Sequence, residues 1–233
     1  MSYSFSIILP VLNESLIINQ TIEHIYRLGH GFDLEVIVVD GDTEGGTVYR
    51  IKDERVIKVI SPKGRGRQMN KGVSVATGNI LLFLHTDTEL PENAFRTISA
   101  VIEKKQCLGG AFDLGIKSGR LIFRLIEKMV YIRTRLTGIP YGDQAIFIKK
   151  DIFAAMNGYQ EIPIMEDVEL MRRIKKSGYK ISIIPQRAST FPRRYEKEGV
   201  VYCTMRNWML MSLYLLGVEP EKLVKYYYRD WNK

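Results

Sequence analysis

Short apolar runs rich in Val, Ile and Leu alternate with segments of helical period along this chain, and this alternation limits the possible folds more than any other feature. Parallel strands are buried on both faces and are connected through helices, so they form continuous apolar runs separated by amphipathic segments. We therefore predict an α/β fold, with a mostly parallel sheet flanked by helices. In the first hundred residues the expected strands are Ser6–Leu12, Leu34–Asp40, Val56–Ile60 and Asn79–Leu84, and the expected helices are Glu14–Leu28, Arg67–Ala76 and Pro91–Lys105.

The ends of these helices carry signals of their own. Asn13 or Ser15 is a suitable N-cap for the first helix, which should end before Gly29. The second helix should end before Gly78, where we expect a left-handed C-cap residue.

The second half of the chain is less regular but of the same kind. Its expected strands are Cys107–Ile116, Gln144–Lys149 and Lys180–Pro185, and its expected helices are Gly119–Leu136, Val168–Ser177, Val200–Leu216 and Glu219–Tyr228. No linker, internal repeat or low-complexity segment divides the 233 residues, a length that buries a core without disulfide or zinc. We predict one domain over residues 1–233 that ends in a helical carboxyl-terminal appendage.

Charge and cysteine content limit the partners and the compartment. The chain has 34 Lys and Arg against 26 Asp and Glu, a net charge of +8, which favours an anionic partner such as nucleic acid, a nucleotide or a lipid headgroup. Cys107 and Cys203 are far apart and match no CxxC or zinc spacing. This favours a reducing compartment and hence a cytoplasmic protein, with a single disulfide as the alternative.

Neither end of the chain predicts a membrane span. The segment Met1–Leu12 has no basic leader or small-residue cleavage site, so it is expected to be a first strand rather than a signal peptide. The longest apolar run, Trp208–Val218, is too short to cross a bilayer and suits a core helix or an interfacial segment. Any membrane contact is expected to be peripheral, at the inner face.

Polar residues follow each expected strand of the first half, where open α/β sheets bind their ligands. After the four strands come, in order, Pro10 to Glu14, Asp40 to Asp42, Lys63 to Arg67, and His85 to Asp87. Each group alone is more often a turn or a cap. Together, the carboxylates and the arginine-rich glycine loop suit a nucleotide diphosphate with a divalent metal. Because the second strand ends beside the first, we expect Asp40 to recognise the nucleoside.

Several enzyme classes do not fit this pattern. The segment Gly64–Gly66 follows the third strand, whereas a dinucleotide fingerprint follows the first strand of its βαβ unit. The chain has no P-loop and no GxSxG, and its three histidines form no zinc pattern. A sugar-1-phosphate nucleotidyltransferase would need a glycine-rich loop directly after the first strand, where Pro10–Glu14 is found instead.

The order and spacing of several motifs are more specific than any one of them. The string GRGRQMNKGVSVATGNILLFLHTDTELP at Gly64–Pro91 carries most of the information, and GDQAIFIKKDIF at Gly142–Phe153, MEDVEL at Met165–Leu170 and FPRRYEKEGV at Phe191–Val200 follow it. With Pro10–Glu14 and Asp40–Asp42, these segments resemble glycosyltransferase family 2 over nearly the whole chain. The triplet His85–Asp87 resembles the branch of that family in which His-x-Asp replaces Asp-x-Asp.

The resemblance implies the GT-A fold, a nucleotide-diphosphate sugar donor, a divalent cation (Mn²⁺ or Mg²⁺) and inversion at the anomeric carbon, with no nucleic acid as partner. Residues 1–90 would form the nucleotide-binding half, and residues 91–233 the acceptor-binding half and the C-terminal helices. The acceptor would be a hydroxyl group on a lipid-linked compound, a saccharide or a small molecule.

The resemblance also gives each candidate residue a role. A single displacement needs a carboxylate near the acceptor hydroxyl as general base, and Asp167 matches it. Metal binding is expected at Asp87 and His85, and contact of His85 with the ribose, or with neither group, is the alternative. Nucleotide binding is expected at Pro10, Asn13, Glu14, Asp40, Arg65 and Arg67, and acceptor binding at Asp143, Gln144, Glu166, Arg193 and Arg194.

Departures from the family pattern leave alternatives open. The QxxRW signature of processive members is not intact, since Tyr195 follows Arg194 and no Gln stands three residues before that Arg, so we expect a non-processive enzyme. A degenerate, non-catalytic nucleotide-sugar or anion-binding domain is the alternative. The segment Phe191–Trp231 is expected to shape the acceptor side and to rest on an anionic membrane, or else to be a solvated helix pair. Its apolar stripe, from Trp208 to Leu215, is predicted to be core.

Overall fold

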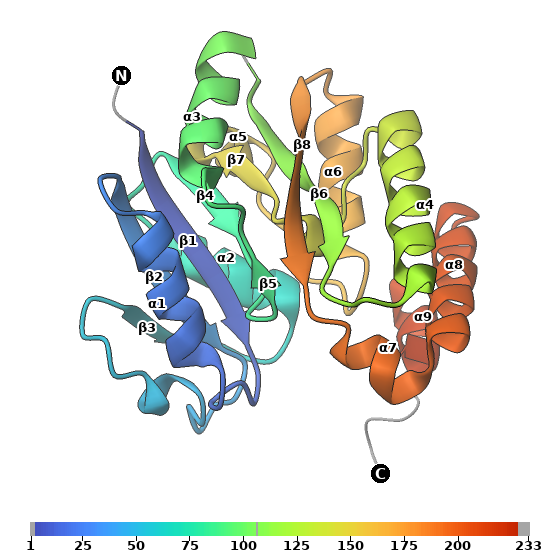
Figure 1. Ribbon diagram of the computed structural model, residues 1–233, viewed down its shortest axis with the longest axis horizontal. Coiled ribbons are helices and arrows are strands. Elements are labelled where there is room, and N and C mark those ends of the chain that lie inside the picture. The colour runs from blue at the N-terminus through green and yellow to red at the C-terminus, as the bar shows by residue number, and fades with distance from the viewer. Residues whose placement is uncertain (1–2, 106, 228–233) are drawn as a thin grey trace.

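One mixed sheet runs through the computed structural model, which describes residues 3–105 and 107–227 (Figure 1). The strands are β1 (Ser4–Val11), β2 (Asp33–Asp40), β3 (Ile57–Ile60), β4 (Ile80–Phe83), β5 (Thr88–Glu89), β6 (Gly109–Ile116), β7 (Phe147–Lys149) and β8 (Ile181–Thr190). The helices are α1 (Ile18–Leu28), α2 (Arg65–Val75), α3 (Ala94–Lys105), α4 (Leu121–Thr137), α5 (Lys150–Ala155), α6 (Glu166–Lys176), α7 (Arg193–Glu198), α8 (Val200–Leu215) and α9 (Pro220–Tyr227), with 3₁₀ turns η1 (Val48–Arg50) and η2 (Gly142–Gln144).

The sheet is mostly parallel, as predicted. Its strand order is β3-β2-β1-β4-β7-β6-β8-β5, and β1 pairs in parallel with both β2 and β4. Strand β7 runs antiparallel to β4 and β6, and β5 runs antiparallel to β8. The carboxyl ends of β1, β4, β6 and β8 therefore point to one edge of the sheet, the lower edge in Figure 1.

Two apolar layers cover the sheet because successive residues of a strand face opposite sides. Ile7 and Leu9 of β1 pack with the buried faces of α1 and α3, whereas Ile8 packs with α2, α5 and α6. A fully buried side chain of this size contributes about 1.5–3 kcal/mol to stability. Helix α2 approaches β1 closely, since a Cβ on Gly72 would lie 2.7 Å from Ile8 Cγ2.

The predicted helical appendage is present. Helix α4 packs on the end of β6 through Phe123 and Ile126, and α8 and α9 pack together around Leu210 and Leu223. No helix within the described ranges is both long and apolar enough to cross a bilayer. Cys107 and Cys203 are buried free thiols, so the alternative of a disulfide between them is wrong.

Several predicted boundaries were wrong for local reasons. Helix α1 begins at Ile18, not Glu14, because the Glu14 carbonyl accepts the N–H groups of Ile17 and Ile18 in a turn. Neither Asn13 nor Ser15 caps it. Asn13 instead has φ 58°, in the left-handed region. The predicted end of this helix before Gly29 is confirmed.

The end of α2 also differs from the prediction. The C-cap is Ala76 in an extended conformation, and Gly78 is not left-handed. Gly78 is required for a different reason, since a Cβ there would lie 2.7 Å from the backbone of Phe5 and Ser6. Its N–H donates to Ser6 Oγ at 2.9 Å, which ties the start of β4 to β1.

Strand β8 continues past Pro185, where the sequence predicts its end. The register with β6 shifts between Phe112 and Asp113, so that Ile184 and Arg187 face consecutive residues of β6. This bulge accommodates Pro185, which has no N–H for the ladder. The prediction missed β5, α5, α7 and both 3₁₀ turns, and the last expected helical residue, Tyr228, lies outside the described residues.

Candidate active site

The short strand β5 brings distant segments together at the carboxyl edge of the sheet. It pairs with the end of β8, and the Phe191 N–H donates to the Asp87 carbonyl at 2.9 Å. This places the loop after β4 beside the start of α7. The Arg193 guanidinium there lies 3.4 Å from Asp87 Oδ2 and 3.1 Å from Glu14 Oε2. The structure thus brings three of the predicted site residues together.

Asp40, by contrast, is fully buried and serves the loop that follows β2. Its carboxylate accepts hydrogen bonds from the N–H groups of Asp42 at 3.0 Å, Thr47 at 2.7 Å and Val48 at 3.1 Å. The Thr47 hydroxyl in turn accepts the Glu14 N–H at 3.1 Å. Our expectation that the Asp40 side chain touches the nucleoside is not supported, because its oxygens are occupied and shielded. Asp40 instead orders the loops after β1 and β2.

His85 and Asp167 both lie close to Gly142. The Gly142 N–H, in η2, donates to Asp167 Oδ2 at 2.5 Å. A Cβ on Gly142 would lie 3.2 Å from His85 Nε2 and 3.3 Å from Asp167 Oδ2. The absence of a side chain at Gly142 therefore allows the imidazole and the carboxylate to converge.

The start of α6 fixes the direction of Asp167. The helix begins two residues earlier than predicted, and its N-cap, Met165, has φ 67°, which is uncommon for a residue with a Cβ. Asp167 Oδ1 accepts the Val168 N–H at 2.7 Å, while Oδ2 accepts the Gly142 N–H. Each carboxylate oxygen has two lone pairs, so each retains capacity for a further hydrogen bond.

His85 is neutral at physiological pH. Burial, and after it the Arg65 guanidinium, lower the pKa of its imidazole to about 4 against the opposing effect of the Asp87 and Asp167 carboxylates. A neutral imidazole offers one nitrogen lone pair, which can accept a hydrogen bond or bind a metal ion.

Asp143 supplies an unsatisfied polar atom beside this group. Its Oδ1 is buried and has no hydrogen-bond partner among the described residues. Burial raises the pKa of the Asp143 carboxyl to about 6, Arg133 opposes this shift, and the charges of Asp167 and Asp87 reinforce it. A ligand hydroxyl placed there would find an acceptor that no described side chain uses.

Glu166 is the most deeply buried carboxylate of the predicted acceptor set, with 4% of its surface exposed. Burial raises the pKa of Glu166 to about 7, with a further contribution from Asp167 and an opposing one from Arg65. Glu166 and Asp167 are therefore adjacent in sequence but differ in environment.

Gln144 is a structural residue rather than an open acceptor ligand. It is fully buried, and its Nε2 donates to the Phe112 carbonyl at 3.0 Å. Its Oε1 accepts from Arg133 Nη2 at 2.9 Å, from the Tyr141 N–H at 3.1 Å and from Thr134 Oγ1 at 3.3 Å. Our prediction that Gln144 binds the acceptor is not supported, because all these hydrogen bonds hold η2 against α4 and β6.

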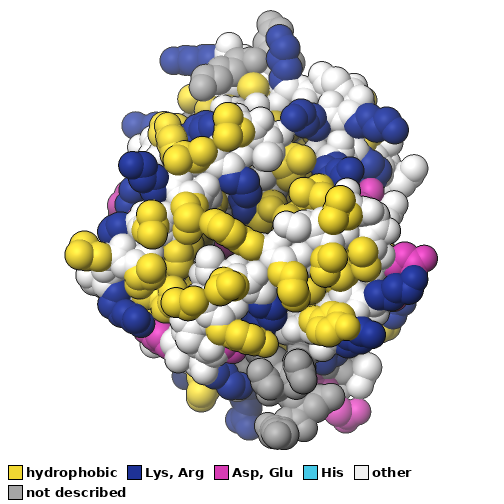
Figure 2. All heavy atoms as spheres, turned by 90° about the vertical axis from the view of Figure 1, so that its right-hand side faces the viewer, with side chains coloured by type: hydrophobic (Ala, Val, Ile, Leu, Met, Phe, Trp, Pro, Cys, Tyr) yellow, Lys and Arg dark blue, Asp and Glu magenta, His cyan; other side chains and the backbone are white. Residues whose placement is uncertain are grey.

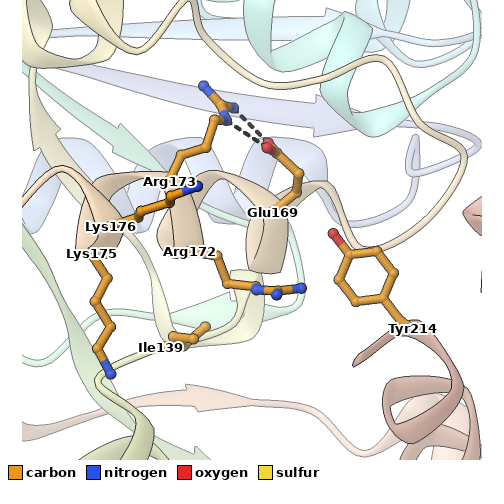
Figure 3. Close-up of a pocket in the computed structure, with 7 residues that line it drawn as sticks. All are labelled: Ile139, Glu169, Arg172, Arg173, Lys175, Lys176 and Tyr214. Carbon is orange, nitrogen blue, oxygen red and sulfur yellow. Dashed lines mark hydrogen bonds and ion pairs between the residues drawn. The ribbon is translucent and has the colours of Figure 1, made fainter. Parts of the chain in front are cut away.

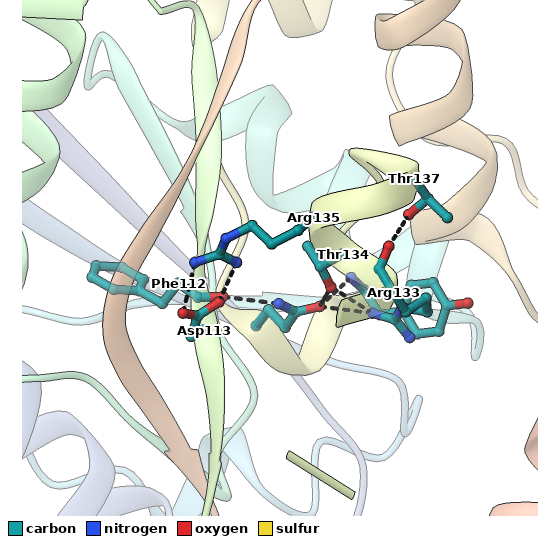
Figure 4. A network of polar contacts seen from close by, with 8 residues as sticks. Phe112, Asp113, Arg133, Thr134, Arg135 and Thr137 are labelled. Atoms are coloured by element: carbon teal, nitrogen blue, oxygen red, sulfur yellow. Dashed lines mark hydrogen bonds and ion pairs between the residues drawn. The ribbon is translucent and has the colours of Figure 1, made fainter. Parts of the chain in front are cut away.

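The polar network around Phe112 and α4 includes residues that the sequence did not single out (Figure 4). Arg135 forms a two-fold contact with Asp113, at 2.6 and 2.8 Å. The Arg133 guanidinium lies 3.3 Å from the centroid of the Tyr141 ring, next to η2. The only sequence signal for these contacts was the presence of several basic residues on the predicted α4 helix.

The predicted arginines divide into two groups. Arg65 lies close enough to influence the pKa values of His85 and Glu166. Arg67 instead pairs with exposed Glu161 at 2.9 Å. Arg194 is removed from the site, since it donates to Glu198 at 3.0 Å and to the Tyr227 carbonyl at 3.0 Å, so the prediction of an acceptor contact there is not supported. Of the remaining predicted residues, Pro10 is half-buried at the end of β1 and Asn13 is exposed in the turn that follows.

A surface hollow of about 500 Å³ lies away from these residues, between α6 and the end of α8 (Figure 3). Arg173 in its wall is paired with Glu169, and Arg172 points toward Tyr214. The full lining is Ile139, Glu169, Arg172, Arg173, Lys175, Lys176 and Tyr214. None of the predicted site residues lines it.

A metal ion would have few protein ligands here. Within residues 3–105 and 107–227, no three His, Cys, Asp or Glu side chains are grouped so as to hold a metal by themselves. Asp87 is partly exposed and His85 is neutral, so both have atoms to offer. This small donor set fits Mg²⁺ or Mn²⁺ that is bound jointly by the protein and by substrate phosphates. A metal ion bound in this way takes only one or two carboxylates from the protein.

Replacing Glu166 with Gln is expected to stabilise the protein at alkaline pH. Because the pKa of Glu166 is raised from 4.5 to about 7, its favourable contribution is full below pH 4.5 and is lost as the pH rises through about 7. One pKa unit corresponds to about 1.4 kcal/mol, so the melting temperature of Glu166→Gln should exceed that of the wild type by at least about 2 °C near pH 8. The excess should shrink near pH 5. Exposed Glu54→Gln is the control, and a pH-independent difference for Glu166→Gln would contradict the assignment.

Comparison with known proteins agrees with this geometry. The model of the family described as glycosyl transferase family 2 matches residues 6–157. A PGL/p-HBAD biosynthesis glycosyltransferase of Mycobacterium bovis is 29% identical over 166 residues, which cover 59% of this chain and 63% of that protein. The chain thus spans about three fifths of the length of the curated relatives it matches.

Two solved structures show the fold. A mannosyltransferase from Pyrobaculum calidifontis, in complex with GDP-Man and Mn²⁺, has a TM-score of 0.60 at 16% identity and covers 82% of this chain and 57% of its own. Glucosyl-3-phosphoglycerate synthase from Mycobacterium tuberculosis, in complex with Mn²⁺, UDP and phosphoglyceric acid, has a TM-score of 0.58 at 16% identity, over 81% of this chain and 70% of its own. The sheet with its flanking helices is the GT-A fold, and the chain belongs to glycosyl transferase family 2.

Proposed function

We propose that this protein is an inverting, non-processive glycosyltransferase that moves a sugar from a nucleotide-diphosphate donor to a hydroxyl acceptor. The observation that carries the proposal is the convergence of Asp167 and His85 on side-chain-free Gly142, close to Asp87 at the carboxyl edge of the sheet. The GDP-Man and UDP bound to the two related structures support a nucleotide-sugar donor.

The reaction needs one carboxylate as general base. The acceptor oxygen forms a bond to the anomeric carbon, the bond from that carbon to the diphosphate breaks, and its electron pair leaves with the diphosphate. The hydroxyl proton goes to Asp167, whose two oxygens are already oriented by the N–H groups of Gly142 and Val168. Such orientation fixes the base where the proton is released.

The leaving diphosphate gathers negative charge near Asp87, Arg65 and Arg193. A divalent cation bound by Asp87 and His85 would supply Lewis-acid stabilisation of that charge. Arg193 contacts Asp87 and Glu14, so in the protein without donor its guanidinium offsets the negative charge of these two carboxylates. In place of the acceptor contact predicted for Arg193, we infer that Arg193 and Arg65 contact the diphosphate. Arg67 and Asn13 would lie at the rim of the nucleotide site.

The two halves of the chain divide the task. Residues 1–90 supply the donor side, including Pro10 and Glu14, with Asp40 ordering the loops. Residues 91–233 supply η2, α6 and α7, where Asp143 and Glu166 are the groups we assign to the acceptor. The unsatisfied Asp143 Oδ1 supports this assignment. The presence of His85 before Asp87 supports placing the chain in the His-x-Asp branch of the family.

A non-catalytic nucleotide-sugar binder is the second candidate. The ion pair between Arg193 and Asp87 favours it, because a neutralised Asp87 binds a cation less well. Donor hydrolysis in the presence of Mn²⁺ or Mg²⁺ distinguishes the two, since a transferase releases some sugar to water and a pure binder does not. Thermal-shift screening of nucleotide sugars with and without Mn²⁺ would identify the donor to use.

The variant Asp167→Asn should keep donor affinity and lose transfer by at least about a hundredfold, because a positioned base is worth about 10²–10⁴ in rate. Transfer kinetics give the rate, and calorimetry with the donor gives the affinity. Exposed Asp151→Asn on α5 is the matched control. If Asp167→Asn transferred sugar within about tenfold of the wild type while Glu166→Gln abolished transfer, the roles of the two carboxylates would be reversed.

The variant Asp87→Asn should lose the dependence of donor binding on Mn²⁺ while it stays folded. Binding of UDP and GDP, measured by calorimetry with and without Mn²⁺, should show at least about a tenfold gain from the metal in the wild type and none in the variant. His85→Ala, tested in parallel, shows whether the imidazole contributes. Full metal-stimulated binding by Asp87→Asn would remove Asp87 from the site, and Asp33→Asn at the start of β2 controls for loss of charge.

A further inference from the structure

Helices α4 and α8 lie side by side on the right of Figure 1 and are apolar on their outer surface. Val200, at the start of α8, belongs to the same apolar cluster as Phe123 and Ile126 of α4. Figure 2 views the molecule from that side and shows hydrophobic side chains spread over a broad area, with Lys and Arg side chains among and around them. We call this surface the α4–α8 face.

The apolar residues of α4 form one continuous outer stripe. Leu121 is 84% exposed, Leu125 52%, Ile132 45% and Leu136 79%. Their intervals of four, seven and four residues place them on one side of a helix with 3.6 residues per turn. An outward stripe of this length is a second amphipathic face, not a scatter of single surface residues.

Helix α8 has a matching stripe. Val201 is 66% exposed, Met205 66%, Trp208 58% and Leu215 56%. Sequence reasoning assigned the stripe from Trp208 to Leu215 to the core, and this was wrong for both of its end residues. Intervals of four, three and seven residues again define one helix face.

The inner faces of the same helices bury both apolar residues, such as Phe123 and Leu210, and polar ones. On α4, Glu127 is 4% exposed and Thr134 is fully buried. On α8, Arg206 is 5% exposed and is paired at 2.5 Å with Glu198, whose side chain is 6% exposed. A helix in contact with water normally carries polar residues on its outer side. The outer stripes of α4 and α8 are therefore a second apolar face, of the kind that marks an interaction surface.

Charge identifies what this surface binds. Helix α8 has no Asp or Glu, and the one acidic residue of α4, Glu127, is buried between Arg124 at 2.9 Å and Arg187 at 3.3 Å. The exposed charges of α4 are therefore positive, including Lys128. Basic side chains beside an apolar surface with Trp208 match the interface of an anionic bilayer, where amphipathic aromatic rings collect. We propose that the α4–α8 face docks on an anionic membrane surface, with its apolar stripes in the headgroup and acyl boundary.

A second copy of the chain fits this face less well. A two-fold contact between two α4–α8 faces would bring Arg124 and Lys128 toward their own copies without an exposed carboxylate on either helix to pair with them. Anionic headgroups provide that counter-charge. The proposal replaces our expectation for Phe191–Trp231, because α4 now contributes, whereas Arg193 pairs with Glu14 and Arg194 pairs with Glu198.

Vesicle binding tests this docking independently of the transferase reaction. The two tryptophans of the chain are Trp208 and Trp231, so Trp231→Phe makes Trp208 the sole indole reporter. With vesicles of phosphatidylcholine and phosphatidylglycerol at low salt, the protein should co-sediment and Trp208 emission should shift to the blue. Brominated acyl chains should quench that emission. High salt should weaken binding, since screening reduces attraction between exposed charges.

Two variants locate the contact. Leu125→Ser with Met205→Ser should lower the partition coefficient at least about tenfold, because each removes buried hydrocarbon from the lipid. Lys128→Glu should weaken binding to vesicles that contain phosphatidylglycerol, but not binding to vesicles of phosphatidylcholine only. Leu16→Ser, at a side chain that is 94% exposed outside this face, is the matched control and should bind as the wild type. Far-UV circular dichroism and thermal melts check that all variants are folded.

Three results would overturn the proposal. The first is no association with anionic vesicles at low salt. The second is binding that the double Ser variant leaves unchanged. The third is a stable dimer in solution that the same variant converts to a monomer, which would show that a second copy covers the face. None of these results bears on sugar transfer, which is measured separately.

Discussion

The donor-side loops of the candidate site depend on how the ends of β1 and β2 are held together. Their register sets Val11 opposite Asp40, and the hydrogen-bonded pairing of the two strands ends at this pair. The buried Gln68 amide of α2 donates to the carbonyls of Val11 and Val39, both at 2.8 Å, and the Gly41 N–H donates to the Val11 carbonyl at 2.8 Å. A buried carbonyl without a partner is costly, so these bonds fix where each strand ends. The donor-side loops start from that fixed edge.

The second constraint is negative charge. Asp87, Asp143, Glu166 and Asp167 all influence one another or the same histidine, and burial raises the pKa values of Glu166 and Asp143. Carboxylates held this close repel one another, and they would also repel a diphosphate that arrived without counter-charge. The nearby guanidiniums, such as Arg193, offset only part of this. This charge is the physical reason for our proposal that the donor arrives with a cation, and Mn²⁺ is present in the two related structures.

Sequence reasoning succeeded where a residue's role follows from its place along a strand. The apolar runs predicted the parallel strands, and the residues after them, such as Asp87, do lie at the carboxyl edge. It failed where the role depends on which side chain a distant segment presents. Gln144 and Arg194 are polar residues in plausible positions, but neighbours tens of residues away turn them inward. Thr47 and Arg133 were missed because nothing local distinguishes them from other loop or helix residues.

Helix α4 contacts the candidate active site on its inner side and forms part of the α4–α8 face on its outer side. On its inner side Arg133 donates to Gln144 and stacks on Tyr141, which shapes η2 and hence the position of Gly142 beside Asp167. On its outer side it carries an apolar stripe. An α-helix is a stiff element with a fixed rise of about 1.5 Å per residue, so the distance from the outer face to the site is set by the fold and not by a flexible linker. The contacts of Arg133 on the inner side of α4 are therefore explained by the site, and the apolar residues on its outer side need the second explanation.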